Sequence, residues 1–430
     1  MTPCYRETMR MFNGQARRRR RGCVGAGTAA LLVAVLALAA GCSSSSPSPA
    51  PSAIRPSAPT VSAAQVQQLF DVADRAVTNR DVAAWRAAVP AVSAAARRGL
   101  KAVYAHLSPL SWPSLHAVVT AVPGGPPGTM DVQFTGSPGG AGPTDRLVAE
   151  LLLTFRPRGG QPTVVADRTF PSLARQGIMA FDAPRQITTP ACTVIFDSTW
   201  KTRAAELANL VPAARAVVVA TYHVRPIRPV AIFLYSSEAE VTGSIGLPAD
   251  QVDHRIQFFT KQVPRLSRSP WAPADVGVLA PALFGQESWT PSMLRHELTH
   301  AFTLQWFSGL RNSPDFLKEG LAVAVEDAGS YAPLRQALAL NEPISLLRAM
   351  EVGDIWAGRT TDAVRLAYAE AGSTIRYVLH RWGFSRLYRW VRSVADSDMT
   401  DAAVVSSVRR ELGIRWRAFV SGWRAYASTL

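Results

Sequence analysis

The sequence predicts an α+β fold in two parts, preceded by an apolar leader and a polar tether. Helical periodicity gives way to strand-like runs in the first part, strands alternate with a helix at the start of the second, and helical patterns fill the rest. With 430 residues, the chain is long enough to bury a core in each part. We expect the segments 1–41, 42–60, 61–185 and 186–430.

Segment 1–41 has the pattern of an export signal. The basic run Arg17–Arg21 precedes the apolar stretch Val24–Ala40, and small residues lead directly to Cys42. This end of the segment resembles the lipobox of a bacterial lipoprotein, whose cysteine thiol receives the lipid. An ordinary secretory signal and an uncleaved membrane helix are the alternatives, although about 17 residues is a marginal length for a span. We expect a lipid anchor at Cys42 and a location at the extracytoplasmic face of the cell membrane.

The segment after the leader is predicted to be a spacer. Ser43–Thr60 consists mainly of Ser, Pro and Ala with no apolar period, which is typical of an extended tether. Cys4 and Cys23 leave with the signal, so Cys192 has no partner for an intramolecular disulfide. Because Cys192 lies in an apolar run, we expect it to be a buried small hydrophobe.

The chain is strongly basic. Its formal net charge is +15, and residues 1–41 contribute seven Arg and one Glu to it. The remaining excess is Arg scattered through helical stretches without a nucleic-acid-binding motif, so no nucleic-acid partner is predicted. Two interpretations of this charge stay open: attraction to anionic lipid headgroups or acidic envelope polymers, and an ordinary basic surface.

Segment 61–185 is predicted to be a small α+β domain. Apolar residues at helical spacing predict helices at 66–77, 82–89 and 91–107. A Gly/Pro-rich break at 123–128 is followed by strand-like runs at 130–136, 145–157 and 162–170. This order of elements resembles the cone-shaped nuclear-transport-factor-2-like domains. His106 and His116 lack the spacing of metal ligands, which predicts packing or surface roles for both.

Segment 186–430 begins with a predicted strand at 191–197, a helix at 204–211 and strand-like runs at 216–221 and 229–236. The polar region 236–273 is predicted to be a loop or lid, with His254 at the surface. The run VGVLAPALFG at 276–285 is predicted to be an edge strand. The C-terminal part then predicts an all-helical subdomain, with helices at 334–340, 344–350, 362–382, 384–394, 401–412 and 415–427.

A metal-site pattern lies between these two halves. His296 and His300 stand four residues apart on a predicted helix that starts at Thr290, with Glu297 completing H-E-x-x-H. Glu319, nineteen residues after His300, lies in a second predicted helix and supplies a third ligand. Three protein ligands with one open position are typical of catalytic zinc, and Glu297 can reach the water there. The alternative is an exposed helix with two surface histidines and an ion-paired glutamate.

The runs HELTH at 296–300 and FLKEGLA at 316–322 resemble the glutamate-zincin metallopeptidases, especially the bacterial peptidase MA-like domains. The resemblance covers about 187–428. It implies a zincin-like domain with a small sheet and a helical lower subdomain, a Zn²⁺ ion on the three ligands, and Glu297 as general base. It also implies that the edge strand, placed at 276–285, pairs with an extended peptide.

The resemblance also singles out Tyr368, which stands where these domains carry a tyrosine before A-G-S and donate to a developing oxyanion. Tyr377 and His380 are alternative donors, and a core role for the Tyr368 ring is another interpretation. The chain departs from the family in two places. It lacks the G-x-M-E-N stretch of aminopeptidases, so exopeptidase action is not implied. Val323, one turn after Glu319, offers no carboxylate to orient a ligand histidine.

Together these patterns predict a membrane-anchored, extracytoplasmic zinc metallopeptidase with a peptide or protein substrate. One alternative is a catalytically inactive zincin-like surface lipoprotein that acts as an interaction protein. Another is an envelope lipoprotein whose N-terminal domain binds a small ligand. The sequence leaves the oligomeric state and the cleavage specificity open.

Overall fold

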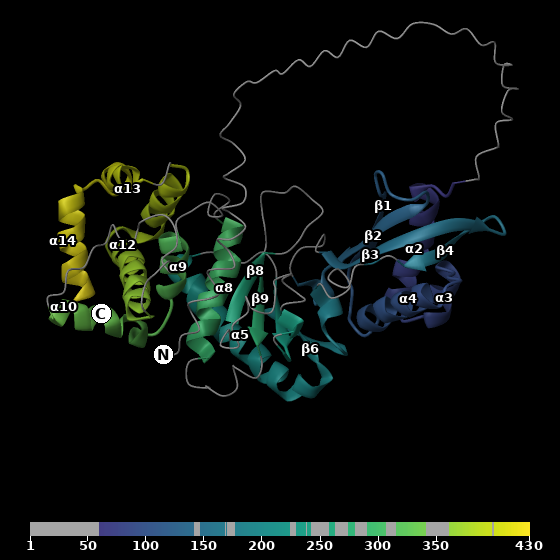
Figure 1. The fold of residues 1–430 in the computed structure, drawn as a ribbon. Helices are drawn as coiled ribbons and strands as arrows, with labels where there is room; N and C mark the ends of the chain where they lie inside the picture. Colours follow the sequence, from purple (N-terminus) through teal and green to yellow (C-terminus); the bar gives the residue numbers. More distant parts are fainter. Residues whose placement is uncertain are drawn as a thin grey trace, which may run out of the picture.

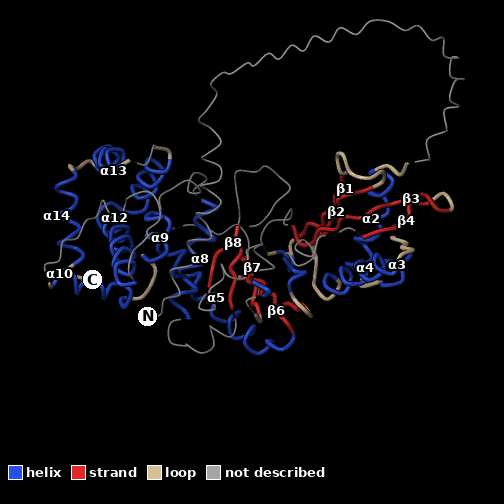
Figure 2. The backbone as a smooth tube through the Cα atoms, viewed as in Figure 1, coloured by secondary structure: helices blue, strands red, loops and turns tan. Residues whose placement is uncertain are grey.

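The computed structural model of the chain describes residues 60–141, 147–167, 169, 177–223, 229–237, 239–241, 258–262, 274–279, 290–306, 315–340, 361–397 and 400–430. The predictions for the leader, Cys42, almost all of the tether, His254 and the helix at 344–350 lie outside these residues. The described residues form two small sheets and many helices, which agrees with a mixed α+β chain (Figures 1 and 2).

The first part has the three predicted helices: α2 (Ala63–Thr78), α3 (Val82–Ala88) and α4 (Ala94–Leu107). Each begins at a side chain that accepts from the backbone N–H three residues on, namely Ser62, Asp81 and Ser93. A four-stranded antiparallel sheet follows, in the order β1-β2-β3-β4. Its strands are β1 (Leu115–Ala121), β2 (Thr129–Gly136), β3 (Leu147–Arg158) and β4 (Gln161–Asp167).

Strand β1 is absent from the sequence-based prediction. Leu115 and Ala117 are buried on its inner side, but the exposed Val118 stands on its outer side. An apolar residue at an outward position hides the period of two that identifies a half-buried strand. The structure places His116 on this outer face, as predicted for a surface residue, whereas the two ring nitrogens of His106 face the carbonyl oxygens of Ala102 and Phe181.

The second sheet has the order β5-β6-β7-β9-β8. Its strands are β5 (Pro184–Thr188), β6 (Cys192–Asp197), β7 (Val230–Tyr235), β8 (Phe258–Gln262) and β9 (Ala274–Leu279). Strands β6, β7 and β9 are parallel, and the antiparallel β5 and β8 form the two edges. Strand β5 spans the predicted boundary between 185 and 186.

Two predictions for this region are wrong. The run 276–285 was expected to be an edge strand, but its described residues belong to β9, which lies between β7 and β8. Within the region 236–273, predicted to be a loop or lid, the described residues 258–262 instead form β8, the edge strand beside β9. Neighbour order in a sheet is set by tertiary packing, which periodicity along one strand does not encode.

The strand predicted at 216–221 is also wrong, because these residues form the last turns of α5 (Lys201–Tyr222). The helix continues past Pro212 and buries Ala214, Val218 and Tyr222, which are spaced four residues apart. Packing on the sheet therefore overrides the β propensity of the Val-rich run. By length and composition alone the helical segment Ser198–Tyr222 could cross a membrane, yet one side of it packs in the core.

Both faces of the second sheet are covered. Alternate residues of β6 and β7, such as Val194 and Ile232, join the core formed with α5 and the C-terminal helices. The residues between them, such as Ile195 and Phe233, join the core of the first part. In Figure 1 the first part accordingly lies on one side of this sheet and the C-terminal helices on the other. This double burial explains why these strands are almost continuously apolar.

The C-terminal helices are α8 (Thr290–Trp306), α9 (Asp315–Val323), α10 (Ala332–Ala339), α12 (Thr361–Ala395), α13 (Asp401–Ser407) and α14 (Trp416–Ala427). Their positions agree with the predicted helices. Within α12, Gly383 has φ 75° and ψ 175°, which breaks the helix where the sequence predicted a boundary. Helix α12 packs against α9 and thereby borders the predicted metal site.

Candidate metal centre

Helix α8 presents two histidines on one face while its opposite face is anchored in the core. Leu294, Leu298 and Phe302 are fully buried in the cluster that also contains the sheet residues. His296 and His300 are one turn apart, so both imidazoles project from the same side. Their ring centroids are 4.7 Å apart, and their Nε2 atoms are 3.1 Å apart.

Helix α9 brings Glu319 to these two nitrogens. Its Oε2 lies 3.3 Å from His296 Nε2, and its Oε1 lies 3.4 Å from His300 Nε2. The three ligand atoms all lie within 4.8 Å of one another. His296 and Glu319 are buried, whereas the His300 side chain keeps 15 % of its surface exposed. The structure therefore brings together the three residues that the sequence predicted as ligands, with access from the side of His300.

Close packing of α9 on α12 fixes where Glu319 stands. A Cβ atom on Gly320 would lie 2.9 Å from the Ala371 carbonyl oxygen, and one on Gly372 would lie 2.5 Å from Val323 Cγ1. Each glycine thus permits an approach that a side chain would block. This gives a physical reason for the glycine that directly follows Glu319.

A further carboxylate, which the sequence analysis missed, orients His296. Glu326 Oε1 lies 2.5 Å from His296 Nδ1, and the Ser330 hydroxyl donates to the other carboxylate oxygen. A hydrogen bond from Nδ1–H to a carboxylate leaves the Nε2 lone pair directed toward Glu319 and His300. Val323, one helical turn after Glu319, offers no carboxylate, and the orienting residue stands three positions further on, beyond the end of α9.

Arg376 on α12 holds the turn that carries Glu326. Its Nε donates to the Ala324 carbonyl and its Nη2 donates to the Glu326 carbonyl, both at 2.8 Å. The guanidinium also lies over the Tyr331 ring, 4.7 Å from its centroid, and the Tyr331 hydroxyl donates to the Val323 carbonyl. These contacts fix the chain between α9 and α10 and thereby the direction of the Glu326 side chain.

The electrostatics of the site favour a bound cation. Burial lowers the pKa of His296, but hydrogen bonds to Glu319 and Glu326 outweigh it and raise that pKa to about 10. Burial raises the pKa of Glu319, but His300 and His296 outweigh it and hold that pKa well below its usual range. Two buried carboxylates thus stabilise positive charge at His296. A bound metal ion can supply this charge in place of the proton, which is then released.

The donor set fits a divalent metal ion. Two imidazole nitrogens and one carboxylate oxygen are ligands that zinc and neighbouring transition metals accept, and three protein ligands leave a position open. Ligand histidines of metal sites usually have a hydrogen-bond partner that fixes the ring, and Glu326 is that partner for His296. Within the described residues, His296, His300 and Glu319 are the group that could hold a metal ion.

The other predicted site residues divide into two groups. Glu297 is buried on α8 directly after His296, and its charge contributes to the raised pKa of His296. Tyr368 on α12 is also buried, with its ring centroid 6.4 Å from that of His296. Tyr377 packs on Phe419, and His380 stacks on Tyr426, so both alternatives face α14 instead of the site.

Comparisons of the chain with protein-family models, curated proteins and solved structures find no match. The geometry of the metal centre and the sequence patterns are therefore the basis for the function proposed below.

Replacing Glu326 by Ala should weaken metal binding by roughly 10–100-fold, because His296 then loses the group that fixes its ring and tautomer. Competition with a chromogenic chelator measures this affinity. Asp327→Asn is the matched control, since Asp327 is an exposed neighbour that pairs with Arg295 and does not touch the ligands. An affinity equal to that of the wild type in Glu326→Ala would show that Glu326 does not orient His296.

Proposed function

We propose that the chain is a zinc metallopeptidase of the glutamate-zincin type that hydrolyses peptide bonds on the outside of a cell. The observation that carries this proposal is the convergence of His296, His300 and Glu319 next to a buried Glu297. The export signal with Cys42 supports attachment to the extracytoplasmic face of the membrane through lipid.

Each site residue has a chemical task in this proposal. His296, His300 and Glu319 would hold Zn²⁺, which when bound would supply Lewis acidity for the scissile carbonyl and for the attacking water. Glu297 accepts the proton of the attacking water and passes it to the leaving amine. Tyr368, whose ring centroid lies 6.4 Å from that of His296, is the proposed donor, and its hydroxyl hydrogen-bonds the developing oxyanion. Glu326 keeps His296 in the tautomer that binds the metal.

Strand β8 is the proposed place for the peptide substrate. It is the last described strand on its side of the sheet, and α8, which carries both histidines, packs against it. An exposed strand edge offers unpaired backbone groups that an extended peptide can join by β-augmentation. The substrate strand thus pairs with β8 and not with the run at 276–285 that the sequence suggested.

Metal removal tests this proposal directly. The purified protein should contain one zinc per chain by elemental mass spectrometry and cleave casein. Treatment with 1,10-phenanthroline should abolish cleavage, and added Zn²⁺ should restore it. Because the metal binds only the folded site, zinc at 100 times its Kd should also stabilise the fold by about 2.7 kcal/mol.

Other outcomes separate the alternatives. A protein that binds zinc but cleaves neither casein nor an unbiased peptide library would point to the inactive, zincin-like interaction protein. A protein that binds no zinc would contradict the metallopeptidase proposal.

A further inference from the structure

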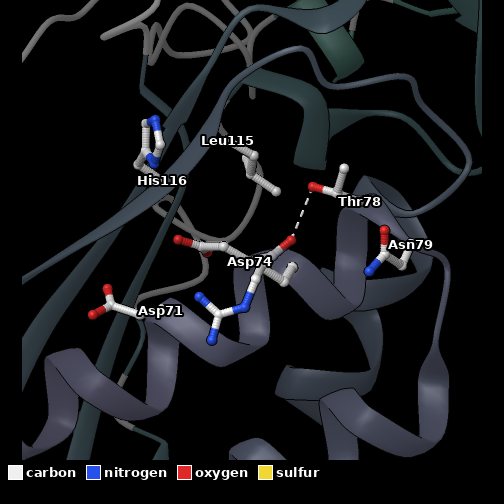
Figure 3. A pocket seen from close by; sticks show the side chains of 7 residues that line it. Asp71, Asp74, Thr78, Asn79, Leu115 and His116 are labelled. Atoms are coloured by element: carbon white, nitrogen blue, oxygen red, sulfur yellow. Dashed lines mark hydrogen bonds between the residues drawn. The ribbon is translucent and has the colours of Figure 1, made fainter.

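The first part of the chain contains a cavity far from the metal centre in the sequence. It has a volume of about 480 Å³ and lies between helix α2 and strand β1. Figure 3 shows the side chains of Asp71 and Asp74 reaching from α2 toward the strand that carries His116, with Thr78 and Asn79 on the other side. The volume is in the range of small-ligand sites.

Asp74 is the buried polar group of this cavity. The residue is only 8 % exposed. Its Oδ2 accepts a hydrogen bond from Ala117 N at 2.8 Å, which fixes the orientation of the carboxylate. Its Oδ1 is buried and has no hydrogen-bond partner among the described residues. Buried acceptors are normally satisfied, so a lone carboxylate oxygen at a cavity needs an explanation.

The hydrogen bond between Asp74 and the backbone of β1 does not explain why a carboxylate stands here. Strand β1 is an edge strand, and side chains of α2 satisfy its outward backbone groups. Gln67 does this for Ala117 O and Val119 N, at 2.8 and 2.9 Å, with a neutral amide. Asp74 satisfies only one N–H, a task that an uncharged acceptor could perform equally well. The negative charge at position 74 is therefore additional to the capping of the strand.

The charges around the cavity indicate the sign of a ligand. The lining contains two carboxyl groups, those of Asp71 and Asp74, and one permanently cationic residue, Arg75. Burial raises the pKa of Asp74 to about 7 and Asp71 adds to this, whereas the hydrogen bond from Ala117 and the charge of Arg75 lower it. The carboxyl group thus lacks enough positive charge nearby, and a cationic ligand would supply it.

We propose that this cavity binds a small organic molecule through a primary ammonium group, which Asp74 Oδ1 accepts beside Asp71. The N–H donors of an ammonium group match carboxylate acceptors. A bare metal ion fits less well, because the described residues form a metal-type cluster only at His296, His300 and Glu319. The cavity is also far larger than one ion requires. The site is independent of the peptidase centre.

Binding should depend on pH in a defined direction. An ammonium ligand prefers the ionised form of Asp74, so affinity is full above the pKa of about 7 and falls as pH decreases through it. The other titratable and charged groups facing Asp74 are Asp71 and Arg75 on α2 and His116 on β1.

The test is calorimetric titration of the purified protein with 1,4-diaminobutane, using 1,4-butanediol as the uncharged molecule of equal length. An alkyl ammonium keeps its charge between pH 6 and 8, like Lys. We expect saturable binding of the diamine, no binding of the diol, and an affinity about tenfold lower at pH 6 than at pH 8, following the ionisation of Asp74. Saturable binding of the diol, or no binding of the diamine, would overturn the proposal.

Variants assign the binding to Asp74. Asp74→Asn keeps the size of the side chain and should weaken diamine binding at least tenfold. Glu206→Gln is the matched control, because Glu206 is an exposed residue of α5 that pairs only locally with Arg203, and it should bind like the wild type. Equal weakening in both variants would reveal nonspecific attraction and overturn the proposal.

A second variant covers the case that Asp74→Asn does not fold. Asp71 is exposed, so Asp71→Asn leaves the core intact. Asp71→Asn should weaken binding several-fold because it removes one of the two carboxylates. Unchanged affinity in Asp71→Asn would place the ligand elsewhere and refute the site.

Discussion

Glu297→Gln is expected to leave the zinc content at one per chain and to reduce peptide hydrolysis by roughly 10²–10⁴-fold, the range in which general acid–base catalysis contributes. Glutamine has nearly the same shape as glutamate, so the buried position on α8 stays filled. It cannot accept a proton from water or return one to the leaving amine. The loss should therefore appear in kcat, with KM little changed.

The measurement combines zinc content by mass spectrometry with kcat and KM on a fluorogenic peptide. Glu206→Gln makes the same chemical change at an exposed site on α5 and should behave as the wild type. A Glu297→Gln variant with wild-type kcat would remove Glu297 from this role, whereas one that lost its zinc would show a structural effect instead.

The sequence predicted the three ligands because their spacing is local. His296 and His300 share a helix face by periodicity alone, and Glu319 follows in the next helix with its own start signal. Glu326 could not be found in this way. Its contact with His296 depends on a turn after α9, and Arg376, fifty residues away on α12, holds that turn. Such a contact exists only after the helices have packed.

The dependence on tertiary packing also explains the errors in the fold prediction. The helices of the first part and α13 carry side-chain caps, and α2, α4 and α14 have clear apolar periods in their own sequence. The run 216–221 has the composition of a strand but the spacing of a buried helix face, and only the sheet beneath α5 decides between them. Strand β8 became the edge because β9 inserts next to β7, an order that no local pattern specifies.

The largest effect on metal binding is expected from Glu319→Ala. Glu319 would supply one of three ligand atoms, and without it only the Nε2 atoms of His296 and His300, 3.1 Å apart, remain to bind the metal. The loss of zinc affinity should therefore exceed the roughly 10–100-fold loss predicted for Glu326→Ala, which removes only an orienting group. Asp327→Asn should have no effect. The loss of zinc affinity should be largest in Glu319→Ala, smaller in Glu326→Ala and absent in Asp327→Asn. This order distinguishes a carboxylate that coordinates the metal from one that orients a ligand and from one that is only a neighbour.

A size-matched variant separates coordination from packing in this series. Glu319→Gln keeps the volume between α8 and α12 but replaces the carboxylate by a weak neutral ligand, so its zinc affinity should be close to that of Glu319→Ala. Far-UV circular dichroism of the metal-free proteins should be the same for all variants, because Gly320 and Gly372, not the ligand itself, set the approach of α9 to α12. Full zinc binding in Glu319→Gln would contradict its assignment as a charged ligand. Wild-type affinity in both Glu319 variants would mean that the third ligand is another residue, and the proposed centre would have to be rebuilt around His296 and His300.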